Sequence, residues 1–254
     1  MSTAFGIDIG GSGMKAAPVD TSTGELLDDR LRIPTPEPST PDRVSAVLNE
    51  LVTSFGWTGP VGCAFPAPIT GRSIKWVAHL HHSWAGVDVA GIMSDRIGAP
   101  VTIINDADAA GIAEMTHGAG VGRSGTVCFT AFGTGIGSAM FVNGILVPNT
   151  EFGHLHLDGQ VQDVETWASA RARERDNLGW PAWGARVQRY LEHLEKIISP
   201  SLFILGGGIS KQFDEWGPLL DIETEVAVAR MRNNAGIVGA AMVSVGKHLP
   251  PTET

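Results

Sequence analysis

The sequence predicts an α/β protein made of two halves. Each half opens with two apolar strands joined by a glycine-rich turn, and each then alternates short apolar runs with longer helical segments. A third glycine cluster follows an apolar strand late in the chain. Because 43% of the 254 residues are hydrophobic and only 18% are charged, each half can bury a core of its own.

The first half begins with a hairpin pattern, in which glycines after Ile9 favour a tight turn. Four prolines within residues 34–41 then interrupt the pattern and predict an extended connection before a helix. Short apolar runs and segments of helical period alternate from there on. We expect strands at residues 4–9, 14–19, 26–33, 61–65 and 101–104, and helices at residues 41–55, 87–97 and 107–116.

The second half repeats the hairpin pattern after residues 118–120. We expect strands at residues 126–132, 138–142, 201–205 and 223–228, and helices at residues 163–175, 181–198 and 234–245. The hinge is expected near Asp106, with the last helix returning to the first half. The predicted domains are therefore an N-terminal small lobe of residues 1–106 plus 235–254 and a C-terminal large lobe of residues 107–234.

Charge and composition exclude several classes of protein. The formal net charge of -9 argues against nucleic acid as the main partner, because non-specific nucleic-acid binding depends on Lys and Arg. No apolar run approaches the ~20 residues that span a bilayer, and no leader pattern is present, so we expect no membrane association and a cytoplasmic location. Two distant cysteines, Cys63 and Cys128, build neither a disulfide framework nor a four-cysteine metal site.

The turn after the first strand has the composition of a phosphate-binding loop. It combines a carboxylate, three glycines, a hydroxyl and a cation, contributed by Asp8, Gly10, Gly11, Ser12, Gly13 and Lys15. Glycines at positive φ would let the backbone turn tightly and expose N–H groups to phosphate oxygens, and the lysine adds positive charge. An ordinary hairpin turn has the same composition, so this turn alone does not decide between the two interpretations.

Two further glycine clusters repeat the pattern at strand ends. They consist of Gly133, Thr134, Gly135 and Gly137 in a second hairpin turn and of Gly206, Gly207 and Gly208 after an apolar strand. In α/β proteins the end of a buried strand is a common place for a phosphate or a nucleotide. The recurrence of the pattern favours phosphate or nucleotide binding over chance.

Polar residues follow the buried strand at residues 101–104. Asn105 and Asp106 stand where α/β folds present ligand-binding groups, and Asp108 comes two residues later. An aspartate at this point can take a proton from a substrate hydroxyl during phosphoryl transfer. The pair is also a good N-cap signal for the following helix, and the two roles are compatible because there is more than one acidic side chain.

A second polar group, Glu151, His154 and Glu165, lies in a loop-like region. Two carboxylates and an imidazole suit the hydroxyl groups of a sugar, each of which can donate and accept a hydrogen bond. Taken alone, this motif is more simply explained as a solvated loop with a capping glutamate.

The densest positive charge of this acidic chain is a run of arginines at positions 171, 173, 175, 186 and 189. Such a run is usually a solvated helix face paired with neighbouring acids. It also suits a track for a phosphate polymer, and the sequence leaves both interpretations open.

Together these motifs resemble the ROK family of sugar kinases and repressors, in particular its polyphosphate glucokinase branch, which includes polyphosphate/ATP glucomannokinases. The segments that carry the resemblance are residues 8–15, 105–110, 132–137, 151–154, Glu165 and 206–208. The resemblance extends over nearly the whole chain. It implies a two-lobed, actin-like (ribonuclease H-like) fold in which sugar and phosphoryl donor meet in a cleft between the lobes.

The resemblance also implies a role for each motif. Asp106 would be the general base of a hexose 6-kinase, and Asn105, Glu151, His154 and Glu165 would bind sugar hydroxyls. The turns at residues 8–15 and 133–137 would hold the phosphates, with Asp8 beside Mg²⁺ directly or through water, and residues 206–208 would line the nucleotide site. ATP, polyphosphate or both would be the donors, and glucose the acceptor, with mannose as a second candidate.

One departure from the family pattern concerns zinc. Most ROK proteins carry a cysteine-rich zinc motif after the Glu-x-Gly-His segment, whereas residues 155–164 contain no cysteine. The polyphosphate branch also lacks this motif, so the resemblance implies no zinc. An ATP-only hexose or N-acylhexosamine kinase, and a non-catalytic sugar-binding protein, are the alternatives, and a homodimer is left open.

Overall fold

The computed structural model describes residues 3–74, 76–77 and 80–246. These residues form two compact units. Unit 1 contains the residues up to Ala113 and those from Asn234 onward, and unit 2 is Glu114–Asn233. Helix α3 (Asp106–His117) carries the chain from unit 1 into unit 2.

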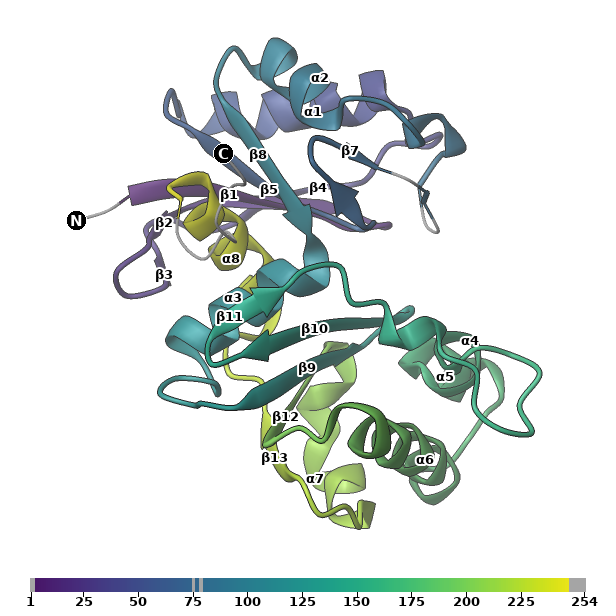
Figure 1. Ribbon diagram of the computed structural model, residues 1–254. Helices are drawn as coiled ribbons and strands as arrows, with labels where there is room; N and C mark the ends of the chain where they lie inside the picture. Colours follow the sequence, from purple (N-terminus) through teal and green to yellow (C-terminus); the bar gives the residue numbers. More distant parts are fainter. Residues whose placement is uncertain (1–2, 75, 78–79, 247–254) are drawn as a thin grey trace. The chain divides into compact units, whose positions relative to one another are not determined.

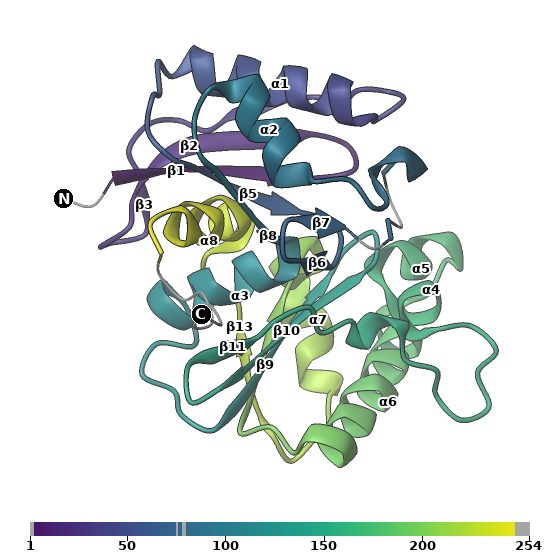
Figure 2. The same cartoon turned by 45° about the horizontal axis from the view of Figure 1, so that its top comes forward.

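A mixed sheet forms the centre of unit 1. Its described strands are β1 (Thr3–Ile9), β2 (Met14–Asp20), β3 (Glu25–Leu26), β4 (Leu31–Ile33), β5 (Val61–Phe65) and β8 (Val101–Asn105). Their order is β3-β2-β1-β5-β8, and β4 also pairs with β2. β1 and β2 form an antiparallel hairpin, whereas β5 runs parallel to both β1 and β8 (Figure 2). The carboxyl ends of β1, β5 and β8 therefore lie at one edge of the sheet, where α/β proteins commonly bind ligands.

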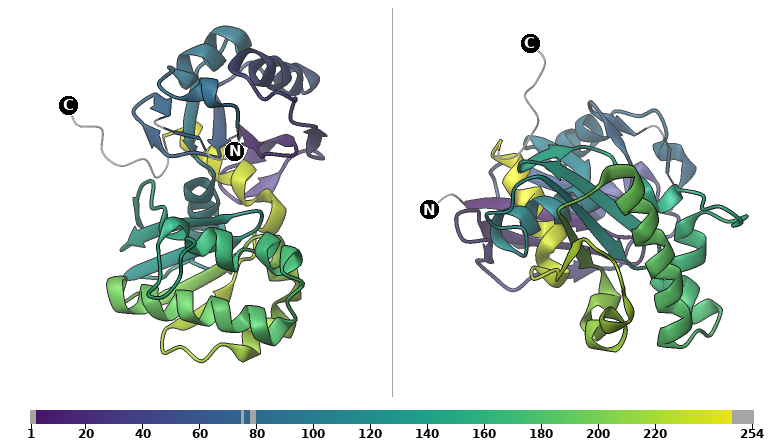
Figure 3. Two further views of the ribbon diagram at one scale, coloured as in Figure 1. Left: turned by 90° about the vertical axis from the view of Figure 1, so that its right-hand side faces the viewer. Right: turned by 60° about the horizontal axis from the view of Figure 1, so that its bottom comes forward.

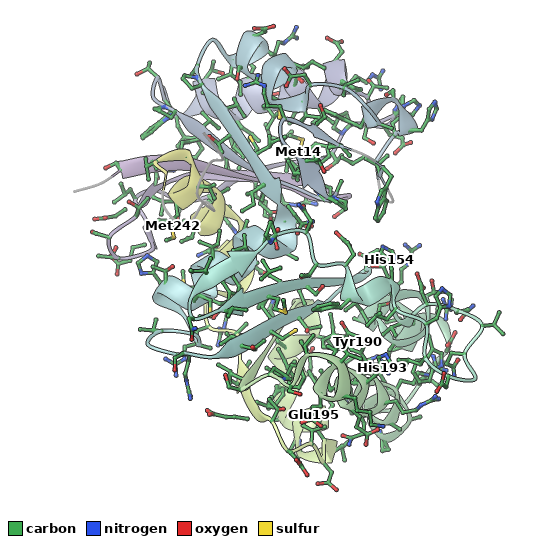
Figure 4. All side chains as sticks on the ribbon, in the orientation of Figure 1. Met14, His154, Tyr190, His193, Glu195 and Met242 are labelled. Carbon is green, nitrogen blue, oxygen red and sulfur yellow. The ribbon has the colours of Figure 1, made fainter. Side chains whose placement is uncertain are left out.

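Helices cover both faces of this sheet (Figure 1). α1 (Pro41–Ser54) and α2 (Val89–Ile97) lie on one face, and α8 (Ala235–Ser244) lies on the other. The core under α1 and α2 includes Met14, which is fully buried, and Met242 of α8 is likewise buried (Figure 4). Burial of such apolar side chains is the main source of stability for the unit.

The contact between α8 and the sheet depends on glycine. A Cβ atom on Gly62 of β5 would come within 1.8 Å of the Ala240 carbonyl oxygen, and one on Gly6 of β1 within 1.9 Å of the Ile237 carbonyl oxygen. Neither backbone atom can move far inside a packed helix. Glycine at these two positions therefore allows the helix to lie directly against the strands.

Unit 2 repeats the arrangement of strands. Its described main sheet contains β9 (Thr126–Phe132), β10 (Ile136–Val142), β11 (Ile145–Val147), β12 (Leu202–Gly206) and β13 (Glu225–Val228), in the order β11-β10-β9-β12-β13. β9 and β10 form an antiparallel hairpin, and β12 runs parallel to β9 and to β13. The hairpin followed by parallel strands thus recurs, which agrees with the internal repeat predicted from the two glycine turns.

The long helix α6 (Trp180–Ile198) lies along the sheet of unit 2 (Figure 3). In the buried core its Trp183 meets Phe132 of β9 and Trp216 of the short helix α7 (Phe213–Trp216). The ring centroids of Phe132 and Trp183 are 5.8 Å apart, and those of Trp183 and Trp216 are 5.0 Å apart, both in edge-to-face geometry. This packing fixes the end of β9, from which the second glycine turn begins.

The prediction of one continuous helix at residues 163–175 was wrong, because this segment forms two helices. α4 (Val164–Ala168) ends at Ser169, and α5 (Ala170–Arg175) begins there. Ser169 adopts an extended conformation, and its hydroxyl oxygen accepts a hydrogen bond from the Ala172 N–H at 3.1 Å. A serine that caps the next helix offers the backbone a partner outside the helix, which explains the break.

The remaining elements are short. They are β6 (Ile69–Thr70), β7 (Ser73–Ile74), α7 (Phe213–Trp216) and the 3₁₀ segments η1 (His82–Trp84), η2 (Phe152–His154), η3 (Gly208–Gln212), η4 (Gly217–Leu219) and η5 (Arg232–Asn234). The strand predicted at residues 26–33 is interrupted and forms only the short β3 and β4. None of the helices in the described residues combines the length and the apolar character that crossing a bilayer requires.

A buried carboxylate ties together three segments of unit 2. Glu114 is fully buried, and its two oxygens accept hydrogen bonds from the backbone N–H groups of Ala119 at 2.9 Å, Arg230 at 3.0 Å and Met231 at 2.6 Å. Three N–H donors compensate for the desolvation of the carboxylate. Glu114 is therefore a structural residue, and its sequence context gave no sign of this role.

Candidate functional site

The first glycine turn joins β1 to β2 and brings opposite charges together. Asp8 is paired in register with Lys15, and the Lys15 ammonium lies 3.0 Å from the Asp8 carboxylate. The turn is closed by a hydrogen bond from the Gly10 N–H to the Gly13 carbonyl at 3.1 Å. Lys15 is thus held near the turn, where its charge can meet a phosphate.

Arg32 is a cationic residue of this turn that the sequence analysis missed. It is paired in register with Lys15 across β4 and β2, and its guanidinium donates to the Ser12 carbonyl at 2.9 Å. A Cβ atom on Gly13 would come within 2.5 Å of the guanidinium. Gly13 therefore makes room for an arginine, and the turn carries two cations instead of one.

The expectation that these turns use positive φ was wrong. Gly10, Gly11 and Gly13 all lie outside the left-handed region, as do Gly133 and Gly135. A neighbouring side chain leaves no room for a Cβ at two of these positions. Arg32 lies against Gly13, and Glu165 lies against Gly135. At Gly13 and Gly135 glycine is therefore explained by packing and not by a left-handed backbone.

Asn105 and Asp106 lie where β8 ends and α3 begins. The Asn105 amide oxygen accepts from the N–H groups of Ala107 at 2.9 Å and Asp108 at 3.0 Å, so this oxygen caps α3. The Asp106 carboxylate accepts from the Ala107 N–H at 2.8 Å and is only partly buried. The buried neighbour thus serves the helix, while Asp106 stays accessible.

Register places Asp8 and Asp106 at the same sheet edge. Asp8 of β1 pairs with Ala64 of β5, which pairs with Ile104 of β8, two residues before Asp106. Neighbouring strands are about 4.8 Å apart, so the β1 and β8 backbones are separated by roughly 10 Å at this level. A phosphate bound beside Asp8 and a hydroxyl bound beside Asp106 would be at neighbouring positions of one edge.

The donor set around Asp8 suits a magnesium ion held jointly with phosphates. Mg²⁺ usually takes one or two protein carboxylates and fills its other positions with water and substrate phosphate oxygens. The Asp8 carboxylate is 19% exposed and so reachable. Within the described residues, no three His, Cys, Asp or Glu side chains are grouped to hold an ion by themselves. An ion beside Asp8 would therefore take most of its ligands from water and phosphate oxygens.

The second glycine turn, in unit 2, is fixed by Glu165. The Glu165 carboxylate accepts from the Ile136 N–H at 2.9 Å, and a Cβ atom on Gly135 would come within 2.1 Å of the same carboxylate oxygen. The Gly133 N–H donates to the Gly135 carbonyl at 2.9 Å and closes the turn. Glu165 therefore joins the polar group predicted for a sugar to the turn predicted for a phosphate.

His154 lies in η2 beside α4 (Figure 4), between carboxylates. Its Nδ1 is 2.9 Å from the Asp163 carboxylate, and its Nε2 is 3.9 Å from the Glu151 carboxylate. Partial burial by itself would lower the pKa of His154, but the hydrogen bond with Asp163 and the charges of Glu165, Asp163 and Glu151 raise it. Burial raises the pKa of Glu151, as does the charge of Glu165, whereas His154 lowers it.

Asp163 is a second residue that the sequence analysis missed. Burial would raise its pKa, but the hydrogen bonds from His154 and Thr166 outweigh this and lower it. The only sequence signal for this residue is its position before the apolar start of α4, which indicates an N-cap. Its contact with His154 joins residues nine positions apart and depends on the fold of the loop between them.

A pocket of about 700 Å³ lies within unit 2. It is lined by residues from the second glycine turn, α5, the start of α6 and η3, namely Phe132, Gly133, Thr134, Ala170, Arg171, Arg173, Glu174, Trp180, Gly208, Ile209 and Gln212. The pocket brings together two of the predicted glycine clusters. Its size is that of sites for small organic ligands.

The three glycines of the third cluster have different positions. Gly208 lines the pocket and has open space beside it. Gly207 has a φ of 85°, and a Cβ atom there would come within 2.1 Å of the Phe132 carbonyl oxygen. A Cβ on Gly206 would press on the ring of Phe129. Gly206 and Gly207 therefore allow β12 and η3 to pack against β9, and they are not among the lining residues of the pocket.

Comparison with known proteins identifies the family. The family model described as "ROK family" matches residues 4–181. The chain belongs to the ROK family. Over 242 residues, which are 95% of this chain and 91% of the relative, the chain is 46% identical to the polyphosphate glucokinase of Mycobacterium tuberculosis. The Mycobacterium leprae polyphosphate glucokinase is 45% identical over 241 residues, 94% of this chain and 74% of the relative.

Solved structures of the family confirm the predicted fold. The inorganic polyphosphate/ATP-glucomannokinase from Arthrobacter sp. strain KM superimposes with a TM-score of 0.92 and 46% identity, covering 96% of this chain and 99% of that one. A ROK family glucokinase from Streptomyces griseus, solved with glucose and AMPPNP, has a TM-score of 0.82 at 23% identity, covering 95% and 98%. The chain thus has the family's two-lobed, actin-like α/β fold.

Proposed function

We propose that this protein is a hexose 6-kinase that transfers a phosphoryl group from polyphosphate, from ATP or from both to glucose, with mannose as a second acceptor. The observation that carries the proposal is 46% identity over nearly the full length of two relatives, one named as a polyphosphate glucokinase and the other as a polyphosphate/ATP-glucomannokinase.

Asp106 is the proposed general base. It is only partly buried at the end of β8, and the neighbouring Asn105 amide oxygen accepts from two N–H groups at the start of α3. A carboxylate in this position can accept the proton of the 6-hydroxyl while the hydroxyl oxygen attacks the terminal phosphorus in line. The bond from that phosphorus to the bridging oxygen of the donor breaks, and the shortened donor keeps the electron pair.

Lys15, Arg32 and the backbone N–H groups of the glycine turns are proposed to stabilise the negative charge of the transferred group. Mg²⁺, bound beside Asp8, would add positive charge to the donor phosphates. Glu151, His154 and Glu165 are proposed to hold the sugar hydroxyls, and the Asn105 amide NH₂ would donate to another. Glu165 also accepts from the Ile136 N–H. Its position when a sugar is bound would therefore affect the conformation of the Gly133–Gly137 turn.

The protein is proposed to act in the cytoplasm. Cys63 and Cys128 are both free and buried, which suits a reducing compartment. The homodimer and the two-lobe boundaries at residues 106 and 235 stay predictions.

The proposal is tested with purified protein, magnesium and one donor at a time. The donors are long-chain polyphosphate and ATP, and the acceptors are glucose, mannose, fructose and N-acetylmannosamine. Formation of hexose 6-phosphate is followed by a dehydrogenase-coupled assay. We expect product from glucose with polyphosphate. Product only with ATP would reduce the proposal to the ATP-only alternative, and no product with any pair would reject it.

A further inference from the structure

The pocket of unit 2 carries two arginines that form no ion pair with any other described residue. Arg171 and Arg173 both line it, next to Gly133 and Thr134. The Arg171 N–H donates to the Gly133 carbonyl at 3.1 Å, which fixes the start of α5 against the glycine turn. The arginines are therefore attached directly to the turn proposed to hold donor phosphates.

Arg173 is held in place with an unused hydrogen-bond donor. Its guanidinium carbon lies 3.6 Å from the ring centroid of Trp180, a cation–π contact that fixes the plane of the group. The Arg173 Nε atom is buried and has no acceptor among the described residues. A buried N–H without an acceptor is costly, so a rearrangement that brings a ligand oxygen to this guanidinium would be favourable.

The other arginines of the run have partners. Arg175 and Arg186 each lie 2.7 Å from the Asp176 carboxylate, and their hydrogen bonds lower the pKa of Asp176 to about 2. Arg189 donates to the Asp158 carbonyl at 2.8 Å. The structure thus separates the run into three arginines with structural partners and two that face a pocket.

We propose that Arg171 and Arg173 bind phosphate groups of a polyphosphate chain beyond the one that is transferred, so that the chain extends from the Gly133–Thr134 turn into this pocket. This inference rests on the proposed function of that turn. Two guanidinium groups against the single carboxylate of Glu174 leave the pocket with excess positive charge. Each internal phosphate of polyphosphate carries negative charge, and guanidinium groups match phosphate oxygens in pairs.

A nucleoside in the same pocket would interact less with the two arginines. The indole face of Trp180 is the lining group best suited to stack on a base, and the Arg173 guanidinium already covers a face of this ring. A nucleoside also brings no charge to neutralise the two arginines. We therefore expect the two arginines to contribute more to the use of polyphosphate than to the use of ATP.

The test compares wild type with the R171Q/R173Q double variant and with R175Q as the matched control. Arg175 belongs to the same helix α5 but pairs with Asp176 and does not line the pocket. Two measurements are made on each protein. The first is the affinity for long-chain polyphosphate and for tripolyphosphate by calorimetry without hexose. The second is kcat/KM with glucose for polyphosphate and for ATP.

For the double variant we expect the affinity for long-chain polyphosphate to fall at least about tenfold, and the loss of kcat/KM with polyphosphate to exceed the loss with ATP by a similar factor. Tripolyphosphate affinity should fall less, because a short chain has few phosphates to place in the pocket. R173K keeps the charge but loses the planar contact with Trp180, and its effect should be intermediate. Thermal unfolding confirms that the variants are folded.

Equal polyphosphate affinity in wild type and the double variant, or equal losses for polyphosphate and ATP, would overturn the inference. So would loss of polyphosphate affinity in R175Q to the same extent. The binding measurement separates this failure from that of the proposed function. A wild type that binds polyphosphate through these arginines but forms no hexose 6-phosphate would support the pocket and reject the kinase.

Discussion

Asp163 contacts His154 with one carboxylate oxygen and begins α4 with the other. Its Oδ2 is 2.9 Å from His154 Nδ1, and its Oδ1 accepts from the Thr166 N–H at 2.9 Å. Glu165 stands in the first turn of that helix. A single carboxylate thus fixes the imidazole and the helix that carries Glu165, so that two of the proposed sugar-binding groups share one support.

Replacing Asp163 with Asn should lower the pKa of His154, because the partner that raises it loses its charge. An NMR titration of the His154 ring protons in both proteins measures the shift, and an unchanged pKa would show that Asp163 does not control the imidazole. Sugar affinity should fall as well, since a neutral amide oxygen holds the ring less firmly than the carboxylate does.

The same pair predicts how stability depends on pH. The pKa of His154 is raised above 6.5, so its contribution is fully present below pH 6.5 and is lost as the pH rises through the raised pKa. The pKa of Asp163 is lowered below 3.8, so its contribution is lost as the pH falls through that lower value. The destabilisation by Asp163→Asn should therefore be largest between pH 3.8 and 6.5 in urea unfolding, and a constant difference at all pH values would contradict this.

A Gly135→Ala substitution should impair hexose use. The added Cβ would lie 2.1 Å from the Glu165 carboxylate and force it away from the Ile136 N–H. We expect kcat/KM for glucose to fall by about tenfold or more, the cost of a charged hydrogen bond. Steady-state kinetics measures this. Glu165→Gln retains an oxygen that can accept from Ile136 and should lose less. Wild-type kinetics in the alanine variant would mean that the turn does not depend on Glu165.

Gly62→Ala should destabilise unit 1. Its Cβ would meet the Ala240 carbonyl at 1.8 Å, and separating α8 from β5 should cost at least the ~1–3 kcal/mol typical of overpacking. Thermal and urea unfolding measure the loss. Gly11→Ala is the control for stability, because a Cβ at Gly11 has no atom within 4 Å. Equal stability of the two variants would show that α8 does not pack as described.

Both thiols should be inert in the native protein. Burial raises the pKa of Cys63 and of Cys128 to about 12, so almost no thiolate is present at neutral pH. We expect a thiol-reactive disulfide reagent to modify neither residue until the chain is unfolded, and then to modify both. Rapid modification of one thiol in native buffer would mean that its surroundings open to solvent.

The sequence was sufficient for elements whose pattern is local. The strand predicted at residues 126–132 has the same bounds in the structure, and α6 starts one residue before its predicted start, since apolar periodicity determines both. Ser169 was not recognised as a cap in the middle of a helical pattern, and the prediction of one continuous helix was wrong.

Contacts across the fold were beyond local pattern. Arg32 reaches the first glycine turn only through the pairing of β4 with β2, and Asp163 reaches His154 across a loop. The pattern of the arginine run fits a solvated face and a phosphate track equally. The structure distinguishes them, because Arg175 pairs with Asp176 whereas Arg173 lines the pocket. These distinctions depend on tertiary neighbours, which a single sequence does not display.

The proposed base is tested by the turnover of an Asp106→Asn variant with glucose and polyphosphate. Asparagine keeps an oxygen for the Ala107 N–H, so the start of α3 should remain intact, and Asp95→Asn on the exposed side of α2 is the control. We predict a loss of ~10²–10⁴-fold in kcat, as for removal of a general base, with glucose binding retained in calorimetry. A kcat within a few-fold of wild type would contradict the assignment of Asp106 as the base.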